Sequence, residues 1–256
     1  MTAVILAGGK GTRLRPFTVT IPKPLLPLGD MPILEVVIRQ LAAAGFSRVV
    51  LTLGHMAHLF TALIGDGSQW GIRVEICVED EPLGTAGPLR LIPDLEDDFI
   101  VMNGDLLTTL DYRALVAEHV AQRAWGTIAT TTRQVDIVYG VIEERPDGTL
   151  DRYNEKPTIY YAVGMGINVL SRHCLEFIPA AGRYDMPQLM TAMKDAGKRV
   201  VCRRTDCYWQ DIGLFDDYER ASADFAADPL RFLPASPHSG PPAPARPRNP
   251  APTRPR

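Results

Sequence analysis

Leu6-Ala7-Gly8-Gly9-Lys10-Gly11-Thr12-Arg13 follows directly on Thr2-Ala3-Val4-Ile5, a short apolar segment that contains β-branched residues. An apolar segment of this kind, ended by glycines, predicts a buried strand over residues 2–7. The three glycines permit positive φ angles and let backbone N–H groups converge on an anion without interference from a Cβ atom. The turn after the first strand is therefore a candidate phosphate-binding loop.

The residues that follow the glycines strengthen this interpretation. Arg13, Arg15 and Lys23 are the only charged residues between Gly11 and Gly29. Arginine can clamp a phosphate with two parallel hydrogen bonds, and lysine adds a compact positive charge. The loop is neither a P-loop nor the dinucleotide fingerprint, because Leu14 stands where the latter needs its third glycine. Triphosphate binding is favoured over a simple tight turn.

Hydrophobic periodicity predicts an α/β fold. Strands are expected at residues 48–53, 72–78, 99–102 and 126–132, and helices at residues 33–44, 56–63, 86–91, 110–121, 186–194 and 214–226. This alternation indicates a doubly wound, mostly parallel, Rossmann-like mixed sheet with helices on both faces. Further strands at residues 139–143, 150–153 and 160–170 predict a small antiparallel β portion over the active site, at the carboxyl ends of the first strands.

Composition excludes some classes of binding partner and indicates which residues form the folded domain. The 256 residues carry a formal net charge of -3, so no basic excess argues for nucleic acid or an anionic membrane surface. We expect no membrane span and no signal peptide, and the four scattered cysteines suit buried, reduced thiols in a cytoplasmic protein. Residues 1–233 are expected to form one domain. Residues 234–256 hold nine prolines, four arginines and no carboxylate, which predicts a disordered tail.

A resemblance to a known family rests on two runs near the N-terminus. Gly8-Gly9-Lys10-Gly11-Thr12-Arg13-Leu14-Arg15-Pro16 and Pro22-Lys23-Pro24-Leu25-Leu26-Pro27 resemble the signature of the sugar-1-phosphate nucleotidylyltransferases, and agreement extends to about Tyr218. The motifs are most similar to those of mannose-1-phosphate guanylyltransferase-like enzymes. The resemblance implies that an NTP and a sugar 1-phosphate are converted to an NDP-sugar and pyrophosphate.

Two aspartates are candidate Mg²⁺ ligands. Asp105 ends the run Asn103-Gly104-Asp105, and Asp211 lies in Trp209-Gln210-Asp211-Ile212-Gly213. Magnesium prefers carboxylate, phosphate and water oxygens, although an aspartate at a strand end is also a common helix cap, and spacing alone leaves both readings open. The resemblance implies that Asp105 and Asp211 bind Mg²⁺, and that Arg13, Lys23 and Lys156 act with them in catalysis.

The resemblance also implies the two substrate sites. The nucleotide site comprises Leu6, Ala7, Gly8, Gly9, Gly11, Thr12, Arg13, Lys23, Glu79, Pro82, Gly84 and Thr85. The sugar-phosphate site comprises Gly140, Glu155, Lys156 and Gly166. The run Leu83-Gly84-Thr85-Ala86-Gly87-Pro88-Leu89 resembles guanylyltransferases more than thymidylyltransferases, and this resemblance favours GTP. A carboxylate at Glu79 or Asp80 accepts hydrogen bonds only, and the Watson–Crick edge of guanine offers N–H donors. Gly164 stands where many relatives have a polar residue, so the resemblance does not identify the sugar.

Two other functions stay open from sequence alone. A nucleotide-sugar-dependent glycosyltransferase would share the fold class, but such enzymes commonly carry Asp-x-Asp where this chain has Asn103-Gly104-Asp105. A non-catalytic, sugar-nucleotide-binding regulatory protein would tend to lose the cationic loop or the metal aspartates, and both are present. Assembly into a homo-oligomer stays open as well.

Overall fold

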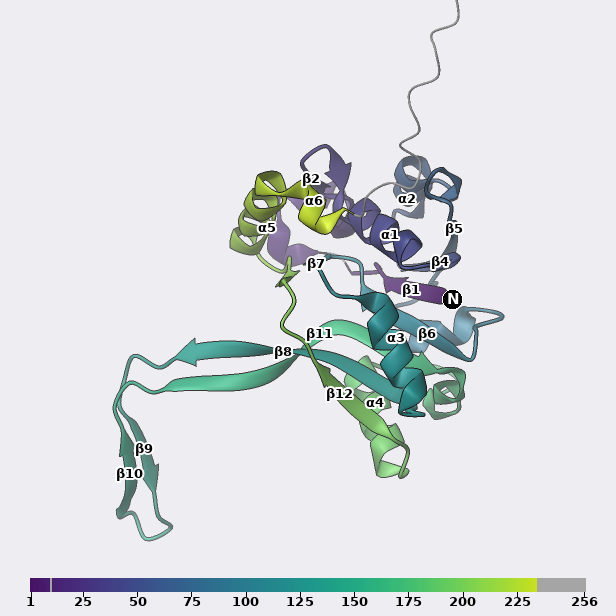
Figure 1. The fold of residues 1–256 in the computed structure, drawn as a ribbon. Coiled ribbons are helices and arrows are strands. Elements are labelled where there is room, and N and C mark those ends of the chain that lie inside the picture. Colours follow the sequence, from purple (N-terminus) through teal and green to yellow (C-terminus); the bar gives the residue numbers. More distant parts are fainter. Residues whose placement is uncertain (10, 234–256) are drawn as a thin grey trace, which may run out of the picture.

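A computed structural model describes residues 1–9 and 11–233 of the chain. Its centre is a seven-stranded sheet in the order β12-β8-β11-β6-β1-β4-β5 (Figure 1). The strands are β1 (Thr2–Leu6), β4 (Arg48–Leu53), β5 (Arg73–Val78), β6 (Asp98–Asn103), β8 (Gly126–Asp136), β11 (Thr158–Ser171) and β12 (Val200–Arg204). Strand β11 runs antiparallel to β6 and β8, and the other neighbouring pairs are parallel. The predicted mostly parallel α/β sheet is confirmed.

Helices cover both faces of this sheet because both faces are apolar. Ala3 and Ile5 of β1 pack on one side with α1 (Ile33–Ala43), α2 (Ala57–Ile64) and α3 (Tyr112–Ala121). Val4 packs on the other side, with α4 (Met186–Asp195) and the short 3-10 helix η5 (Gly87–Leu91). Alternate residues of a strand point to opposite faces, so one continuous apolar run can serve two helical layers.

A third cluster lies beside the sheet and closes one end of the protein. It includes Leu14, Leu26 and Ile212, packed against α5 (Phe215–Ala227) and α6 (Pro229–Phe232). Two short antiparallel pairs join it: β2 (Pro27–Leu28) with β3 (Met31–Pro32), and β7 (Leu106–Thr108) with β13 (Trp209–Asp211). The remaining 3-10 helices are η1 (Thr12–Leu14), η2 (Phe17–Val19), η3 (Lys23–Leu25), η4 (Ser68–Trp70) and η6 (Arg172–Phe177).

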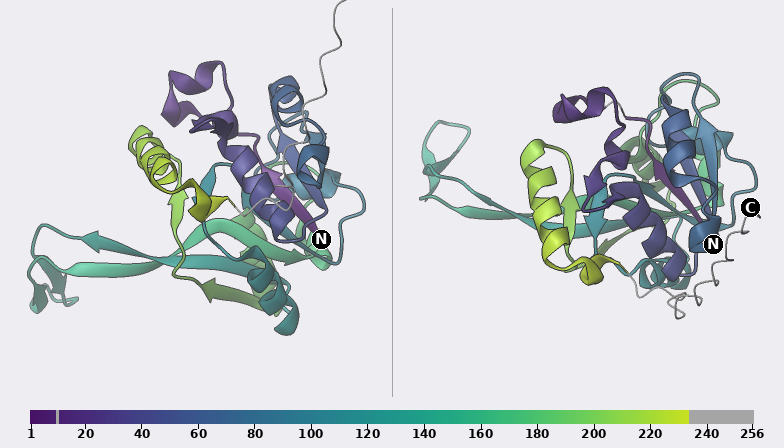
Figure 2. Two further views of the ribbon diagram at one scale, coloured as in Figure 1. Left: turned by 45° about the horizontal axis from the view of Figure 1, so that its top comes forward. Right: turned by 90° about the horizontal axis from the view of Figure 1, so that it is seen from above.

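Strands β8 and β11 continue beyond the sheet as a two-stranded arm, defined here as residues 133–161. The arm ends in the hairpin of β9 (Val141–Glu144) and β10 (Leu150–Asn154), and Figures 1 and 2 show it extending away from the helices and the sheet. The expected small antiparallel β portion is confirmed, and it consists of the β9–β10 hairpin and the pair β7–β13. The extension follows from runs of β-branched and aromatic residues that continue the β8–β11 ladder past the sheet.

The five longer helices all lie within two residues of their predicted bounds, and the expected short helix is the 3-10 helix η5. Strand β12 was not predicted, because its exposed edge carries Arg203 and Arg204 and its apolar run is short. The four cysteines are free, as expected, but only Cys174 is buried. Within the described residues, none of the helices has the length and apolar character needed to cross a bilayer. The expected tail, residues 234–256, lies outside the described residues.

Candidate active site

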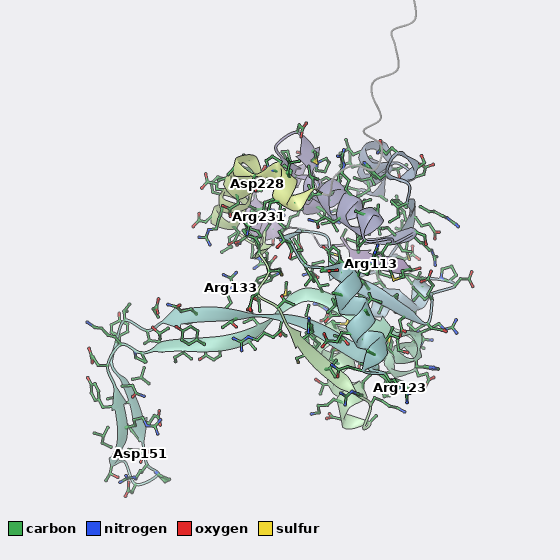
Figure 3. The ribbon with its side chains drawn as sticks, in the orientation of Figure 1. Arg113, Arg123, Arg133, Asp151, Asp228 and Arg231 are labelled. Atoms are coloured by element: carbon green, nitrogen blue, oxygen red, sulfur yellow. The ribbon has the colours of Figure 1, made fainter. Side chains whose placement is uncertain are left out.

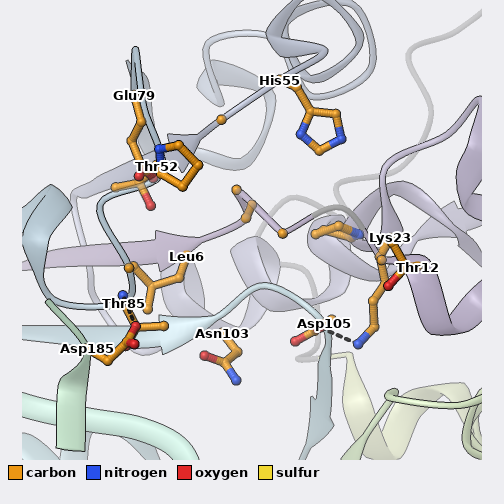
Figure 4. A pocket seen from close by; sticks show the side chains of 18 of the residues that line it. Leu6, Thr12, Lys23, Thr52, His55, Glu79, Thr85, Asn103, Asp105 and Asp185 are labelled. Atoms are coloured by element: carbon orange, nitrogen blue, oxygen red, sulfur yellow. Dashed lines mark hydrogen bonds and ion pairs between the residues drawn. The ribbon is translucent and has the colours of Figure 1, made fainter. Parts of the chain in front are cut away.

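A pocket of about 490 Å³ opens at the carboxyl ends of β1, β4 and β6 (Figure 4). All twelve residues expected at the nucleotide site line it, and so does Asp105. The pocket is also lined by residues that sequence reasoning did not select, namely Pro24, Thr52, Gly54, His55, Asn103, Arg183, Asp185 and Gly213. One wall therefore comes from the glycine-rich loop and another from the segment that follows β5.

The glycine-rich loop is held in place by backbone hydrogen bonds to both neighbouring strands. Ala7 N donates to Thr52 O at 3.0 Å, and Gly104 N donates to Leu6 O at 3.1 Å. Gly11 has a φ of 59°, in the left-handed region that favours glycine. The hydroxyl of Thr18 donates to Gly11 O at 2.7 Å and fixes the end of the turn. The loop thus presents its backbone to the pocket without a covering side chain at Gly8, Gly9 or Gly11.

Lys23 and Asp105 line one end of the pocket, and Asp211 lies beside them although it is not among the residues that line it. Lys23 is 8% exposed, and its Nζ lies 2.5 Å from Asp105 Oδ2. The antiparallel pair β7–β13 brings Asp211 beside Asp105, with Asp211 paired to Leu106 and Ile212 N donating to Asp105 O at 3.1 Å. Segments about a hundred residues apart are joined in this way.

The pKa of Asp211 responds to the charges of the neighbouring side chains. Burial of the carboxyl, and then the negative charge of Asp105, raise the pKa of Asp211, whereas the positive charges of Lys23 and Arg13 lower it. Two facing carboxylates of this kind suit a divalent cation, because Mg²⁺ is usually bound by one or two carboxylates plus substrate phosphates and water. No group of three or more metal-binding side chains occurs in residues 1–9 and 11–233. The donor set therefore fits a Mg²⁺ ion that shares its remaining ligands with a substrate.

The opposite end of the pocket is built around Glu79, which follows β5. Glu79 is 8% exposed, and its Oε2 accepts a hydrogen bond from Leu83 N at 3.0 Å. Its Oε1 faces the glycine-rich loop, where it lies 3.2 Å from the place that a Cβ atom on Gly8 would occupy. A larger residue than glycine at position 8 would crowd this carboxylate.

The neighbouring wall depends on a residue a hundred positions further along the chain. Asp185 caps the N-terminus of α4, and its Oδ1 also accepts a hydrogen bond from Thr85 N at 3.0 Å. The Thr85 hydroxyl in turn accepts from Met186 N at 2.7 Å. Gly84 has a φ of 85°, and a Cβ atom there would lie 2.6 Å from Tyr184 O. Helix α4 thus fixes the turn that closes this wall.

The residues expected to bind the sugar phosphate are not among those that line the pocket. Gly140, Glu155 and Lys156 lie together on the arm, where it joins the β9–β10 hairpin, and a Cβ atom on Gly140 would lie 3.0 Å from Glu155 Oε2. Gly166, in β11, adopts a φ of 70° and packs against Asn103, which lines the pocket. The structure therefore joins the nucleotide residues in one place and leaves most of the sugar residues on the arm.

Comparisons with a family model and with known proteins point to the same family. Residues 2–228 match the family described as nucleotidyl transferase. The chain is similar to a UTP–glucose-1-phosphate uridylyltransferase of Synechocystis sp., at 32% identity over 86% of this chain and 62% of that protein. It is similar to a mannose-1-phosphate guanyltransferase of Schizosaccharomyces pombe, at 34% identity over 85% of this chain and 62% of that protein. The chain thus spans less than two thirds of the length of these relatives.

A similar structure is that of HddC from Yersinia pseudotuberculosis in complex with GMP-PN. It superposes with a TM-score of 0.65 at 26% identity, covering 88% of this chain and 99% of that one. Relatives and neighbours of this kind therefore act on, or bind, more than one nucleotide base.

Proposed function

Because the chain belongs to the nucleotidyl transferase family, we propose that it transfers a nucleotidyl group from an NTP to a sugar 1-phosphate. The products are an NDP-sugar and pyrophosphate. The observation that carries the proposal is the pocket itself, which combines a glycine-rich loop, the Lys23–Asp105 pair and the neighbouring Asp211 at the ends of three parallel strands. Parallel α/β sheets bind their ligands at this edge.

The chemistry needs no covalent intermediate on the protein. A phosphate oxygen of the sugar 1-phosphate forms a bond to the α-phosphorus, and the bond from that phosphorus to the bridging oxygen breaks as pyrophosphate leaves. Positioning and charge stabilisation are then the main contributions of the protein. Backbone N–H groups at Gly8, Gly9 and Gly11 bind the triphosphate, and Arg13 offsets its charge. Lys23 orients the Asp105 carboxylate through its ion pair.

Asp105 and Asp211 would hold Mg²⁺, which supplies Lewis-acid stabilisation of the phosphates when it is bound. Glu155 and Lys156 are assigned to the sugar hydroxyls and the sugar phosphate, with Gly140 and Gly166 leaving room for the sugar. This assignment requires the arm and the pocket to meet around the bound substrates.

Guanine is the base that the pocket suits best. The carboxylate of Glu79 accepts hydrogen bonds, and guanine presents N–H donors on its Watson–Crick edge. Thymine and uracil present two carbonyls around a single N–H, so a carboxylate suits them less well. The guanylyl-transferring relative and the GMP-PN complex of HddC support this proposal, and the uridylyltransferase relative is its main rival.

The test is pyrophosphate release with Mg²⁺, each NTP in turn and a set of sugar 1-phosphates. We expect Asp105→Asn and Arg13→Ala to lower kcat by roughly 100-fold or more, by analogy with the loss of a charge-stabilising donor at other active sites. Glu79→Gln is expected to lower kcat/KM for GTP and to leave that for the other NTPs little changed. Near-normal turnover in Asp105→Asn and Arg13→Ala would contradict the mechanism, and sugar transfer to an acceptor would favour a glycosyltransferase.

A further inference from the structure

The arm carries a cation at the point where it leaves the sheet, between the pocket and the proposed sugar residues. Arg133 of β8 pairs directly with Tyr161 of β11, so the two side chains lie on the same face of the arm. Figure 3 shows Arg133 where the two long strands emerge from the body. Lys156 lies further out along the same arm.

Arg133 rests on a tryptophan of β13, the strand that also carries Asp211. Its guanidinium carbon lies 5.1 Å from the ring centroid of Trp209. The indole is itself fixed, because Trp209 Nε1 donates to Met165 O at 2.8 Å. Trp209 and Asp211 are alternate residues of β13 and point to the same face, about 7 Å apart along the strand. The Trp209 ring therefore places the Arg133 guanidinium on the face of β13 that also carries the Asp211 side chain.

The charge of Arg133 is not neutralised as the charges of the hairpin arginines are. The two arginines of the β9–β10 hairpin pair with carboxylates: Arg145 with Asp151 at 3.0 Å, and Arg152 with Glu143 at 3.7 Å. Among the residues that the structure describes, no carboxylate lies within ion-pair distance of Arg133. A guanidinium resting on an aromatic ring keeps its N–H edge available for an anion such as a carboxylate or a phosphate.

We propose that Arg133 binds the phosphate of the sugar 1-phosphate and sets it beside Asp211 for attack on the α-phosphorus. This inference rests on the proposed function. Lys23 is already paired with Asp105 and Arg13 is assigned to the triphosphate, so Lys156 is the one cation assigned above to the phosphate of the second substrate. A phosphate monoester carries close to two negative charges at neutral pH, and a guanidinium can meet two of its oxygens at once. Arg133 and Lys156 then approach the same phosphate from two points on the arm.

The experiment compares steady-state kinetics of Arg133→Ala, Arg133→Met and Arg133→Lys, with mannose 1-phosphate, glucose 1-phosphate and the NTP varied separately. Methionine still covers the Trp209 ring but has no charge, so it separates packing from phosphate binding. We expect kcat/KM for the sugar phosphate to fall about tenfold or more in both Arg133→Ala and Arg133→Met, as for the loss of a charged hydrogen bond. The KM for the NTP is expected to stay within about twofold, because the change removes no group assigned to the triphosphate.

Arg133→Lys is expected to recover part of the loss, because the charge returns without the planar fork. Arg145→Ala is the matched control, since it removes an arginine of the same arm that is paired with Asp151 and should leave both KM values unchanged. Full activity of Arg133→Met would overturn the assignment and leave Arg133 as a cover for Trp209. A wild-type protein that neither releases pyrophosphate nor binds either sugar phosphate, followed by tryptophan fluorescence, would overturn the proposed function and this inference together.

Discussion

Replacing Lys23 by methionine tests how much the Lys23–Asp105 ion pair contributes to the stability of the folded protein. Lys23 and Asp105 form a close ion pair in which the lysine side chain is 10% exposed and the aspartate side chain 21%. The substitution removes the cation and leaves the carboxylates of Asp105 and Asp211 facing each other. The pKa of Asp211 is already raised, first by burial and then by Asp105, so the loss of Lys23 would raise it further.

The magnitude follows from burial. Removing one partner of a fully buried ion pair costs about 3–5 kcal/mol of stability. Because a fifth of the Asp105 side chain is exposed to water, we expect about 2–3 kcal/mol for Lys23→Met. That corresponds to a decrease in Tm of roughly 4–12 °C for a domain of this size. Asp105→Asn should cost only about 1 kcal/mol, because Lys23 keeps Asp211 as a counter-charge and the repulsion between the carboxylates disappears.

The assay is thermal unfolding of both variants in EDTA and in MgCl₂. Magnesium should restore part of the loss in Lys23→Met, which keeps two carboxylates, and less in Asp105→Asn. Lys194→Met is the matched control, since Lys194 forms an exposed pair with Asp195 and its removal should cost under about 0.5 kcal/mol. A Lys23→Met protein as stable as the wild type in EDTA, or a larger loss in Asp105→Asn, would refute this reasoning.

Three other substitutions test the structure away from that cluster. Gly84→Ala should destabilise the protein by about 1–3 kcal/mol and raise the KM for the NTP, because the φ of 85° and the nearby backbone exclude a Cβ atom; unchanged thermal unfolding would count against it. A hydrogen bond from Arg48 lowers the pKa of Glu75. The ionised Glu75 therefore stabilises the folded protein at pH values above the ordinary pKa of a glutamate, and this contribution is lost as the pH falls through the pKa of Glu75 in the folded state. Glu75→Gln should therefore be less stable than the wild type at pH 7 and lose less on acidification. Burial lowers the pKa of His119 despite the carboxylate of Asp98, so the unfolded state takes up the proton first below about pH 6.5. Urea unfolding should show stability falling from pH 7 to pH 5, and a His119→Gln variant with the same slope would contradict this.

Much of the fold can be predicted from local patterns in the sequence. Helix α1 follows from apolar residues at helical spacing, and the loop after β1 follows from its glycines and cations. Strand β12 was not predicted from the sequence, because an edge strand with exposed arginines lacks the apolar run that is typical of a central strand. The direction of the arm depends on how far the β8–β11 ladder continues, which no local pattern specifies.

The candidate site divides in the same way. Its glycines, Glu79 and the two aspartates lie in recognisable motifs, whereas Asp185 and Arg183 do not. Asp185 reaches the pocket only because helix α4 packs against the turn at Thr85, a hundred residues earlier. Contacts between distant segments of this kind carry no signal in a single sequence, and pocket residues that depend on them become visible only in the folded chain.

The most direct test of the proposed reaction is product analysis by mass spectrometry. Wild-type protein is incubated with Mg²⁺, GTP and one sugar 1-phosphate, and the NDP-sugar and pyrophosphate are quantified over time. The account predicts that both products accumulate in equal amounts and that Asp105→Asn forms neither at a comparable rate. Guanosine products without a sugar attached, or no product with any NTP from a protein shown to be folded, would contradict nucleotidyl transfer to a sugar phosphate.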